Sequence, residues 1–226
     1  MDGLLLVNKP TGISSFGVVA RVRRVLSQDA GHKVKIGHTG TLDPAAAGLM
    51  ILVIGSYTKR AAEFSKLDKT YDVELTLGQV STTADSEGQL TKTSDKQPSL
   101  EEIQTVLDSF VGQISQTPPA FSAVKVDGQR AYKLARAGKD VVIEPRQVTI
   151  HSIKNIEYKY PKLSFLTEVS SGTYIRSLAV DIGQKLGTGA YMSKLTRTKI
   201  ADYDVAEAIE LEPFNAKVIQ AHIHHL

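Results

Sequence analysis

The 226-residue sequence contains neither cysteine nor tryptophan, and it has only three methionines. Without cysteine, the chain has no disulfide framework, no thiolate zinc site, no iron–sulfur cluster and no cysteine nucleophile. The longest uninterrupted apolar run, residues 49–54, is far below the roughly 20 residues that cross a bilayer. The first nine residues are too short and too acidic for a signal peptide. We therefore expect neither export nor a membrane span.

The composition is that of a folded protein with a weakly basic balance. Apolar residues make up 42% of the chain, enough for one large domain or two small ones. The formal charge is +3, but the charge is uneven: between Lys125 and Asp140 there are five basic residues and two acidic ones. Charge alone fits solvated helix faces as well as a nucleic-acid partner.

Periodicity and turn residues predict a mixed chain in which strands and helices alternate. We read it as one domain, with the basic residues 118–148 as a protruding sub-element and no clear linker. Loops are expected at residues 37–48 and 82–96, where glycine and polar residues break the period. Strands are expected at residues 4–7, 49–54, 71–77, 141–143, 148–156 and 163–169, and helices at 16–27, 58–66, 99–110 and 178–186.

The segment around Asp43 is the first candidate for chemistry. Gly37 and Gly40 allow its backbone to approach a substrate closely, so Asp43 fits an acid, a base or a nucleophile, although Asp-Pro is also common in plain turns. His38 in the same segment fits a general base, a phosphate contact or a hydrogen-bonding residue of the loop.

Three further residues favour a nucleic-acid substrate more specifically than charge does. Tyr71 and Tyr174 stand at the ends of strand-like segments, where an exposed ring could stack on an unpaired base, although half-buried packing is the commoner role there. Arg176 could pair with a carboxylate and keep it ionised, or form a surface ion pair.

Several rival functions fail on spacing. The sequence has no G-x-x-x-x-G-K-[ST] motif and no G-x-S-x-G elbow, and Gly187-Thr188-Gly189 follows a helix where a dinucleotide fingerprint must follow a strand. The histidines near the C-terminus have no carboxylate or cysteine partner in sequence, so we expect no metal site.

Taken in order, six motifs and the opening segment resemble the TruB-type tRNA pseudouridine 55 synthases, from Gly3 to about Ile209. The opening segment is Gly3-Leu-Leu-Leu-Val-Asn-Lys-Pro-Thr-Gly-Ile-Ser-Ser15. The motifs that follow are Gly37-His-Thr-Gly-Thr-Leu-Asp-Pro44, Asp68-Lys-Thr-Tyr71 with Leu77-Gly78, Thr82-Thr-Ala-Asp85 with Gly88, Pro118-Pro-Ala-Phe-Ser-Ala-Val-Lys125, Gly172-Thr-Tyr-Ile-Arg176 and Leu195-Thr-Arg-Thr198.

The resemblance implies roles for the residues that match these motifs. Asp43 falls on the essential aspartate of the family, Tyr71 on the tyrosine that stacks on the flipped base, and Arg176 on the arginine paired with the aspartate. Tyr174 and Leu195 fall on residues that line the uridine pocket. Whether the aspartate attacks the ribose or removes a ribose proton to give a glycal stays open, because both roles need an ionised carboxylate.

The resemblance also implies contacts to the rest of the substrate. His38 falls on the histidine that helps to keep the T arm open, and residues 118–148 fall on the mobile segment that closes over the tRNA. Lys69, Lys133 and Arg136 are the further substrate-binding residues that we expect.

The fold that the resemblance implies is α+β: a pseudouridine-synthase-like, mixed and mainly antiparallel sheet flanked by helices and loops. We expect residues 1–226 to form a single catalytic domain without the small RNA-binding PUA domain into which bacterial members commonly continue. The expected enzyme is a cytoplasmic monomer that acts on the T arm of tRNA without cofactor or metal. The alternatives are a tRNA folding chaperone and a pseudouridine synthase for another RNA.

Overall fold

The computed structural model divides the chain into two compact units. The terminal unit consists of Met1–Tyr71 and Leu195–Leu226, and the central unit is Asp72–Lys194. Strands β4 (Lys69–Leu77) and β12 (Ala190–Ile200) each continue from one unit into the other. The structure describes residues 1–122, 124–126, 128–139, 141–212 and 215–225.

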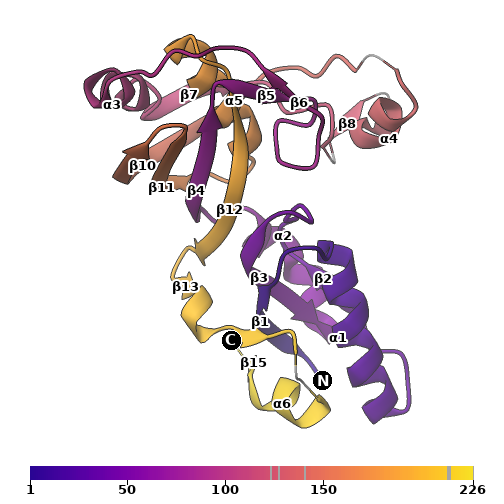
Figure 1. The fold of residues 1–226 in the computed structure, drawn as a ribbon. Helices are drawn as coiled ribbons and strands as arrows, with labels where there is room; N and C mark the ends of the chain where they lie inside the picture. The colour runs from indigo at the N-terminus through magenta and orange to yellow at the C-terminus, as the bar shows by residue number, and fades with distance from the viewer. Residues whose placement is uncertain (123, 127, 140, 213–214, 226) are drawn as a thin grey trace. The chain divides into compact units, whose positions relative to one another are not determined.

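The terminal unit is built on the antiparallel pair β1 and β3, beside which the end of β12 runs parallel to β3 (Figure 1). Short strands extend both sides: β14 and β15 pair with β1, and β2 pairs with β3. The elements are β1 (Gly3–Lys9), α1 (Ser15–Ala30), β2 (Ile36–His38), β3 (Ala47–Ile54), a 3-10 helix (Gly55–Arg60), α2 (Ala61–Ser65), β13 (Tyr203–Asp204), a second 3-10 helix (Val205–Glu207), β14 (Ile209–Glu210), α6 (Ala216–Ala221) and β15 (Ile223–His224).

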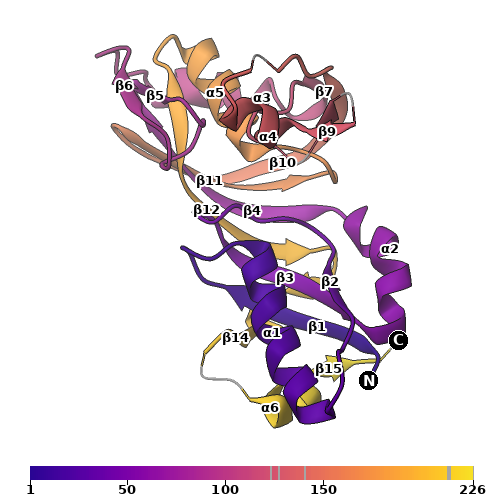
Figure 2. The same ribbon diagram turned by 90° about the vertical axis from the view of Figure 1, so that its right-hand side faces the viewer.

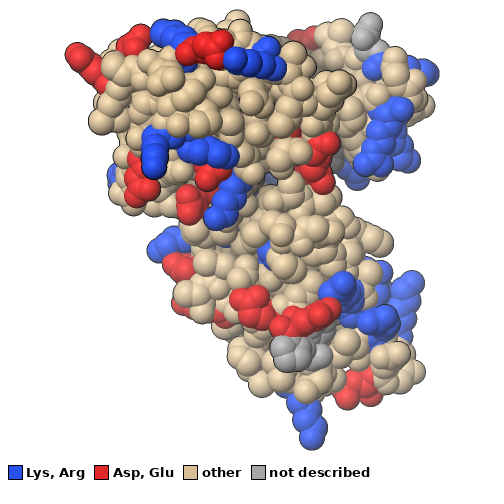
Figure 3. All heavy atoms as spheres, in the orientation of Figure 1, with Lys and Arg blue, Asp and Glu red and all other residues tan. Residues whose placement is uncertain are grey.

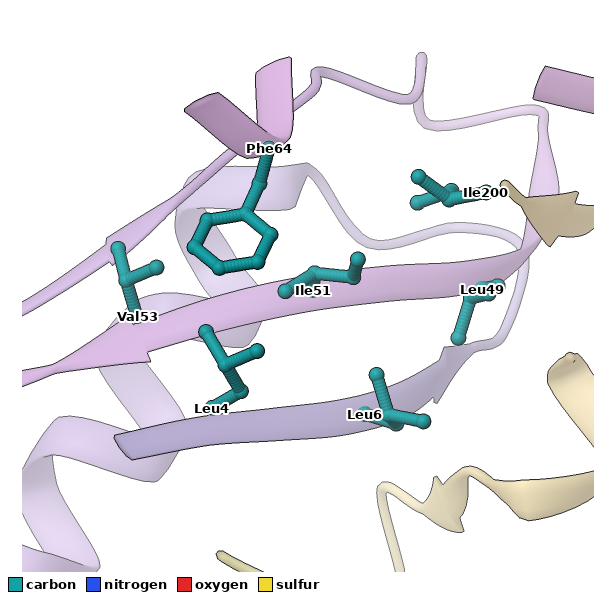
Figure 4. Packing of buried hydrophobic residues seen from close by; sticks show 7 residues of the cluster. All are labelled: Leu4, Leu6, Leu49, Ile51, Val53, Phe64 and Ile200. Atoms are coloured by element: carbon teal, nitrogen blue, oxygen red, sulfur yellow. The ribbon is translucent and has the colours of Figure 1, made fainter. Parts of the chain in front are cut away.

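The core of the terminal unit forms around β3, which is buried along its whole length after Ala47. Seven side chains from β1, β3, α2 and β12 meet in one cluster (Figure 4): Leu4, Leu6, Leu49, Ile51, Val53, Phe64 and Ile200. Helix α1 lies across β1 and β3 (Figure 2) and buries Val18, Val19, Val22 and Leu26. Such a packed core gives a rigid support for the loop between β2 and β3.

The central unit has the strand order β4-β11-β10-β7, in which β10 is antiparallel to both β11 and β7. Helices α3 and α5 and the short helix α4 belong to the same unit. With the terminal unit, this gives the α+β fold with mainly antiparallel strands that the sequence predicted. The elements are β5 (Gln79–Ser81), β6 (Leu90–Lys92), α3 (Leu100–Asp108), β7 (Gly112–Gln116), β8 (Lys125–Val126), β9 (Gln129–Arg130), α4 (Ala131–Arg136), β10 (Arg146–Lys159), β11 (Lys162–Val169) and α5 (Ile175–Leu186).

Helices with clear end signals were predicted correctly. The Ser14 hydroxyl accepts a hydrogen bond from the Gly17 N–H and caps α1. Ser99 and Glu102 form a reciprocal capping box at the start of α3. Helix α5 ends at Gly187, whose φ of 68° is left-handed.

Three predicted segments were wrong in part or whole. The loop at residues 37–48 is shorter, because Gly37 and His38 pair with β3 and β3 itself begins at Ala47. The loop at 82–96 contains β6, which pairs with β5. Residues 141–143 form no strand among the described residues, and Val142 is 81% exposed, which an apolar run does not reveal.

Two expectations stay predictions: a single catalytic domain at residues 1–226, and residues 118–148 as a sub-element that grips RNA. Within that segment, Ala123, Asp127 and Asp140 lie outside the described residues. Across the part of the chain that the structure describes, no helix is both long and apolar enough to pass through a membrane.

Candidate active site

Asp43 lies in the loop between β2 and β3, and its neighbours fix its backbone. The Asp43 carbonyl accepts a hydrogen bond of 3.0 Å from the Ala46 N–H, which closes a turn around Pro44. The Pro44 carbonyl accepts one of 2.8 Å from the Gly12 N–H. The opening Lys-Pro-Thr-Gly segment thus contacts the residue next to Asp43.

Ser15, the first residue of α1, binds the residue on the other side of Asp43. Its buried hydroxyl donates to the Leu42 carbonyl and accepts from the Leu42 N–H, both at 2.8 Å. A single hydroxyl therefore satisfies both polar groups of the Leu42 backbone, which have no partner in a regular element.

Lys9, at the end of β1, is fully buried and links the same two segments. Its ammonium donates to the Ile13 carbonyl at 2.8 Å, the Pro10 carbonyl at 3.0 Å and the Pro44 carbonyl at 3.4 Å. Burying an ammonium is unfavourable unless its protons are bonded, and the carbonyls of these turns bond them.

Arg197, from β12, binds the first part of the loop and the strand that follows it. The side chain is only 1% exposed. Its Nε donates to the Leu49 carbonyl at 2.7 Å and its Nη2 to the Gly40 carbonyl at 3.2 Å. The Cβ of an alanine at Gly48 would lie 2.3 Å from the Arg197 carbonyl oxygen, so the two backbones approach as closely as only glycine allows.

His38 ends β2 just before the loop, in surroundings that favour its neutral form. Burial lowers its pKa, and the positive charge of Arg197 lowers it further. Its Nδ1 is buried and has no hydrogen-bond partner within the described residues. A neutral imidazole suits contact with a base or ribose better than an ion pair with phosphate.

Lys69, the first residue of β4, is buried at the end of α2. Its ammonium donates to the Ser65 carbonyl at 2.7 Å and to the Leu67 carbonyl. Burial lowers its pKa to about 8; the nearby Arg197 charge acts in the same direction, and Asp68 partly opposes it. Lys69 is therefore mostly protonated at pH 7 and mostly neutral at pH 9.

The lowered pKa of Lys69 predicts a pH-dependent stability. Between pH 8 and about 10.5 the unfolded chain binds a proton at Lys69 that the folded chain has lost, so the free energy of unfolding rises with pH in this window. In urea unfolding at pH 7.5, 8.5 and 9.5, the wild type should gain stability relative to Lys69→Met. If the difference in the free energy of unfolding between the wild type and Lys69→Met is the same at all three pH values, the lowered pKa of Lys69 is contradicted, because every other group titrates in both proteins.

Tyr71 and Leu195 lie at the limits of the terminal unit, in β4 and β12. Tyr71 is only 8% exposed, so its ring is not the freely exposed one that the sequence suggested. Leu195 is buried to the same degree. An apolar and aromatic pair of this kind is typical of pocket walls, and the pocket role of both stays a prediction.

Arg176 and Tyr174 belong to the central unit, at the start of α5. Arg176 is buried; its Nη2 donates to the Phe121 carbonyl at 2.8 Å and its Nη1 to the Thr83 carbonyl at 3.2 Å, with Nε 3.7 Å from Asp85. The Tyr174 backbone is fixed by both ends of the Gln116 amide. The predicted pairing of Arg176 with Asp43 joins residues of two units and stays a prediction.

Lys133 and Arg136 are exposed on α4, where basic side chains gather on the surface (Figure 3). The Arg136 guanidinium lies 5.7 Å from the centre of the Tyr132 ring. Cations beside an aromatic ring are typical of RNA contacts, and this role too stays a prediction.

Sequence reasoning quoted Lys9, Ser15 and Arg197 within motifs but gave them no function. The structure makes them the residues that fix the Asp43 loop. The signal that could have found these residues is a charged or hydroxyl side chain within a segment that the fold buries. Within the described residues, no group of three or more histidine, aspartate or glutamate side chains is placed to bind a metal ion.

Comparison with solved structures supports the fold. The chain matches the chain in the "Crystal Structure of a Cbf5-Nop10-Gar1 Complex" with a TM-score of 0.71, at 28% identity over 92% of its length. It matches the "Structure of H/ACA RNP bound to a substrate RNA containing 2'-deoxyuridine" with a TM-score of 0.68, at 25% identity. It spans about half the length of these two solved chains, 52% and 51%.

Comparison of sequences identifies the family more specifically than the comparison of structures does. The model of the TruB family pseudouridylate synthase N-terminal domain matches residues 23–175, and that of the tRNA pseudouridylate synthase B C-terminal domain matches 176–225. The tRNA pseudouridine synthase B of Aquifex aeolicus is 44% identical over 95% of this chain and 74% of its own. That of Opitutus terrae is 42% identical over 96% and 88%. The chain therefore belongs to the TruB family of pseudouridylate synthases and is an enzyme of the isomerase class.

Proposed function

We propose that this protein converts one uridine in the T arm of tRNA, at position 55, to pseudouridine, with Asp43 as the essential carboxylate. The relatives above carry tRNA in their names, and the family match covers the Asp43 loop. The observation that carries the proposal is the way in which that loop is fixed.

Asp43 is flanked on both sides by backbone that residues outside the loop bind. Ser15 binds Leu42, and Lys9 and Gly12 bind Pro44. A carboxylate in a plain surface turn has no need of such support. A catalytic carboxylate does, because an error of about 1 Å in its position can reduce the rate on the order of 100-fold.

The charge around the loop favours an anionic substrate and an ionised acid. Lys9, Lys69 and Arg197 are three buried cations of the terminal unit, and two of them bond directly to carbonyls of the loop. Positive charge near a carboxylate favours its ionised form, and it also attracts phosphate.

The reaction is balanced without a cofactor. The bond from uracil N1 to ribose C1′ breaks, and a bond from C5 to the same C1′ forms. C5 then loses its proton, and N1 gains one. No electrons leave or enter, so a carboxylate, a pocket for the base and a route for one proton are sufficient. Asp43 acts either as the nucleophile at C1′ or as the base that forms a glycal.

The target base must leave the stack before this chemistry is possible, at a cost of about a few kcal/mol. We assign Tyr71 to stacking on the flipped base and Arg176 to pairing with the Asp43 carboxylate. Tyr174 and Leu195 would line the uridine pocket. His38 would help to keep the arm open, and Lys69, Lys133 and Arg136 would contribute positive charge toward the RNA.

The site of modification tests the proposal. With a tRNA transcript tritiated at uracil C5, we expect release of one tritium per tRNA and a single pseudouridine at position 55 of the T arm. A transcript with cytidine at that position should release nothing. Modification at another position, or of an unrelated RNA in preference to tRNA, would contradict the assignment.

A further inference from the structure

Helix α1 presents an exposed aromatic ring at its first turn. Phe16 is 66% exposed, and no other aromatic residue that the structure describes is exposed. Leaving a phenyl ring in water forgoes the stabilisation that burial would supply. A single exposed apolar residue needs no explanation by itself, so the residues around the ring decide whether its exposure indicates a function.

Phe16 is the sequence neighbour of a residue that supports the Asp43 loop. Phe16 directly follows Ser15, whose hydroxyl bonds to the Leu42 backbone immediately before Asp43. Consecutive Cα atoms are about 3.8 Å apart, so the backbone of Phe16 lies next to that of Ser15, while the Phe16 side chain points to solvent and the Ser15 hydroxyl into the protein. A substrate at Asp43 would bring its neighbouring nucleotides toward this end of α1.

The ring also has a cation beside it. The Arg23 guanidinium carbon lies 5.9 Å from the centre of the Phe16 ring, and its Nη2 donates to the Ile36 carbonyl of β2 at 3.1 Å. Ala20 and Arg24 follow Phe16 at intervals of four, which places all three on one exposed face of α1. Because Ala20 has only a methyl group, no large side chain stands between Phe16 and Arg24 on this face.

We propose that Phe16, Ala20, Arg23 and Arg24, the α1 patch, bind a second nucleotide of the tRNA, outside the uridine pocket. Phe16 stacks on an unpaired base, and Arg24 contacts its phosphate. This inference rests on the proposed function. An exposed aromatic ring beside one hydrogen-bonded and one exposed guanidinium group matches a nucleobase with its phosphate, whereas an aliphatic protein surface would need a broader apolar patch.

Four substitutions test the α1 patch: Phe16→Ala, Phe16→Leu, Phe16→Tyr and Arg24→Gln. Phe16→Ala should weaken tRNA affinity by about 5- to 100-fold. Its single-turnover rate at saturating enzyme should fall less than about twofold, because Phe16 lies outside the pocket. Phe16→Tyr, which keeps an aromatic face, should bind within about twofold of wild type, and Phe16→Leu should bind like Phe16→Ala. The control is Leu100→Ala on α3, a residue 57% exposed, which should change nothing.

The salt dependence of tRNA affinity separates stacking by Phe16 from the phosphate contact of Arg24. Arg24→Gln should reduce the slope of log affinity against log salt by about one, and Phe16→Ala should leave that slope unchanged. Unaltered affinity of Phe16→Ala would overturn the α1 patch. Full binding by Phe16→Leu would also overturn it, in favour of an ordinary apolar contact. If the wild type fails to modify tRNA, the proposed function fails; if it modifies tRNA while Phe16→Ala binds normally, only the α1 patch fails.

Discussion

Asp43→Asn is expected to lower the single-turnover rate of tritium release by at least about 10⁴-fold while leaving tRNA affinity within about threefold of wild type. The amide has the shape of the carboxylate but neither its negative charge nor its basicity. The hydrogen bonds to the backbone of Leu42, Asp43 and Pro44, which hold the loop, are kept in this variant. Rates at saturating enzyme and separate binding isotherms measure the two quantities.

A matched exposed acid provides the control for this result. Asp202→Asn, a residue in the turn after β12, should retain wild-type turnover. Retained turnover by Asp43→Asn would refute the proposed chemistry.

The same variant separates the enzyme from a folding chaperone. If opening and reannealing of the tRNA arm is the main activity, it should survive Asp43→Asn. It should be lost when Lys133 and Arg136 on α4 are both replaced by glutamine, since unfolding and refolding an arm depends on contacts to its phosphates.

Gly48→Ala is expected to lower the free energy of unfolding by at least about 4 kcal/mol, or to prevent folding. The new Cβ would lie 2.3 Å from the Arg197 carbonyl oxygen and 2.7 Å from its backbone nitrogen, both of which are backbone atoms that cannot rotate away. The φ of Gly48 is also +104°, a value that L-residues rarely adopt. Urea unfolding at constant pH measures the loss.

Gly12→Ala is the control for this substitution. Gly12 also has a positive φ, +83°, but a Cβ there would meet nothing within 4 Å. It should therefore lose only the strain of the backbone, about 1 kcal/mol. Equal losses at Gly48 and Gly12 would show that the close approach of β3 and β12 is not what destabilises the protein.

The parts of the fold that the sequence predicted are those with local signals. Helix α1 has a serine cap and apolar residues at helical spacing, and α3 has a capping box within four residues. Strand β12 was missed, because a buried arginine and several hydroxyls interrupt its apolar residues, and its parallel partner β3 is far away in sequence. The order of its buried and exposed residues identifies β12 as a strand only when its position beside β3 is known.

The candidate site divides in the same way. Asp43 became a candidate because glycine, aspartate and proline cluster within eight residues, and its catalytic role stays a prediction. The residues that fix its loop were not predicted, because their contacts join distant positions: Ser15 with Leu42, 27 residues apart, and Arg197 with Gly40, 157 apart. A motif records which residues occur in order, whereas a hydrogen bond between distant residues depends on the folded chain.

Because Arg197 lies late in the sequence, the Asp43 loop is completed late in synthesis of the chain on the ribosome. Translation adds about 5–20 residues per second, so Gly40 emerges on the order of ten seconds before the guanidinium that binds its carbonyl. The stretch Asp72–Lys194 is complete only three residues before Arg197, and until then the loop that carries Asp43 lacks the guanidinium that binds Gly40. A nascent chain therefore carries Asp43 for most of its synthesis without this contact, and we expect a chain terminated before β12 to be inactive.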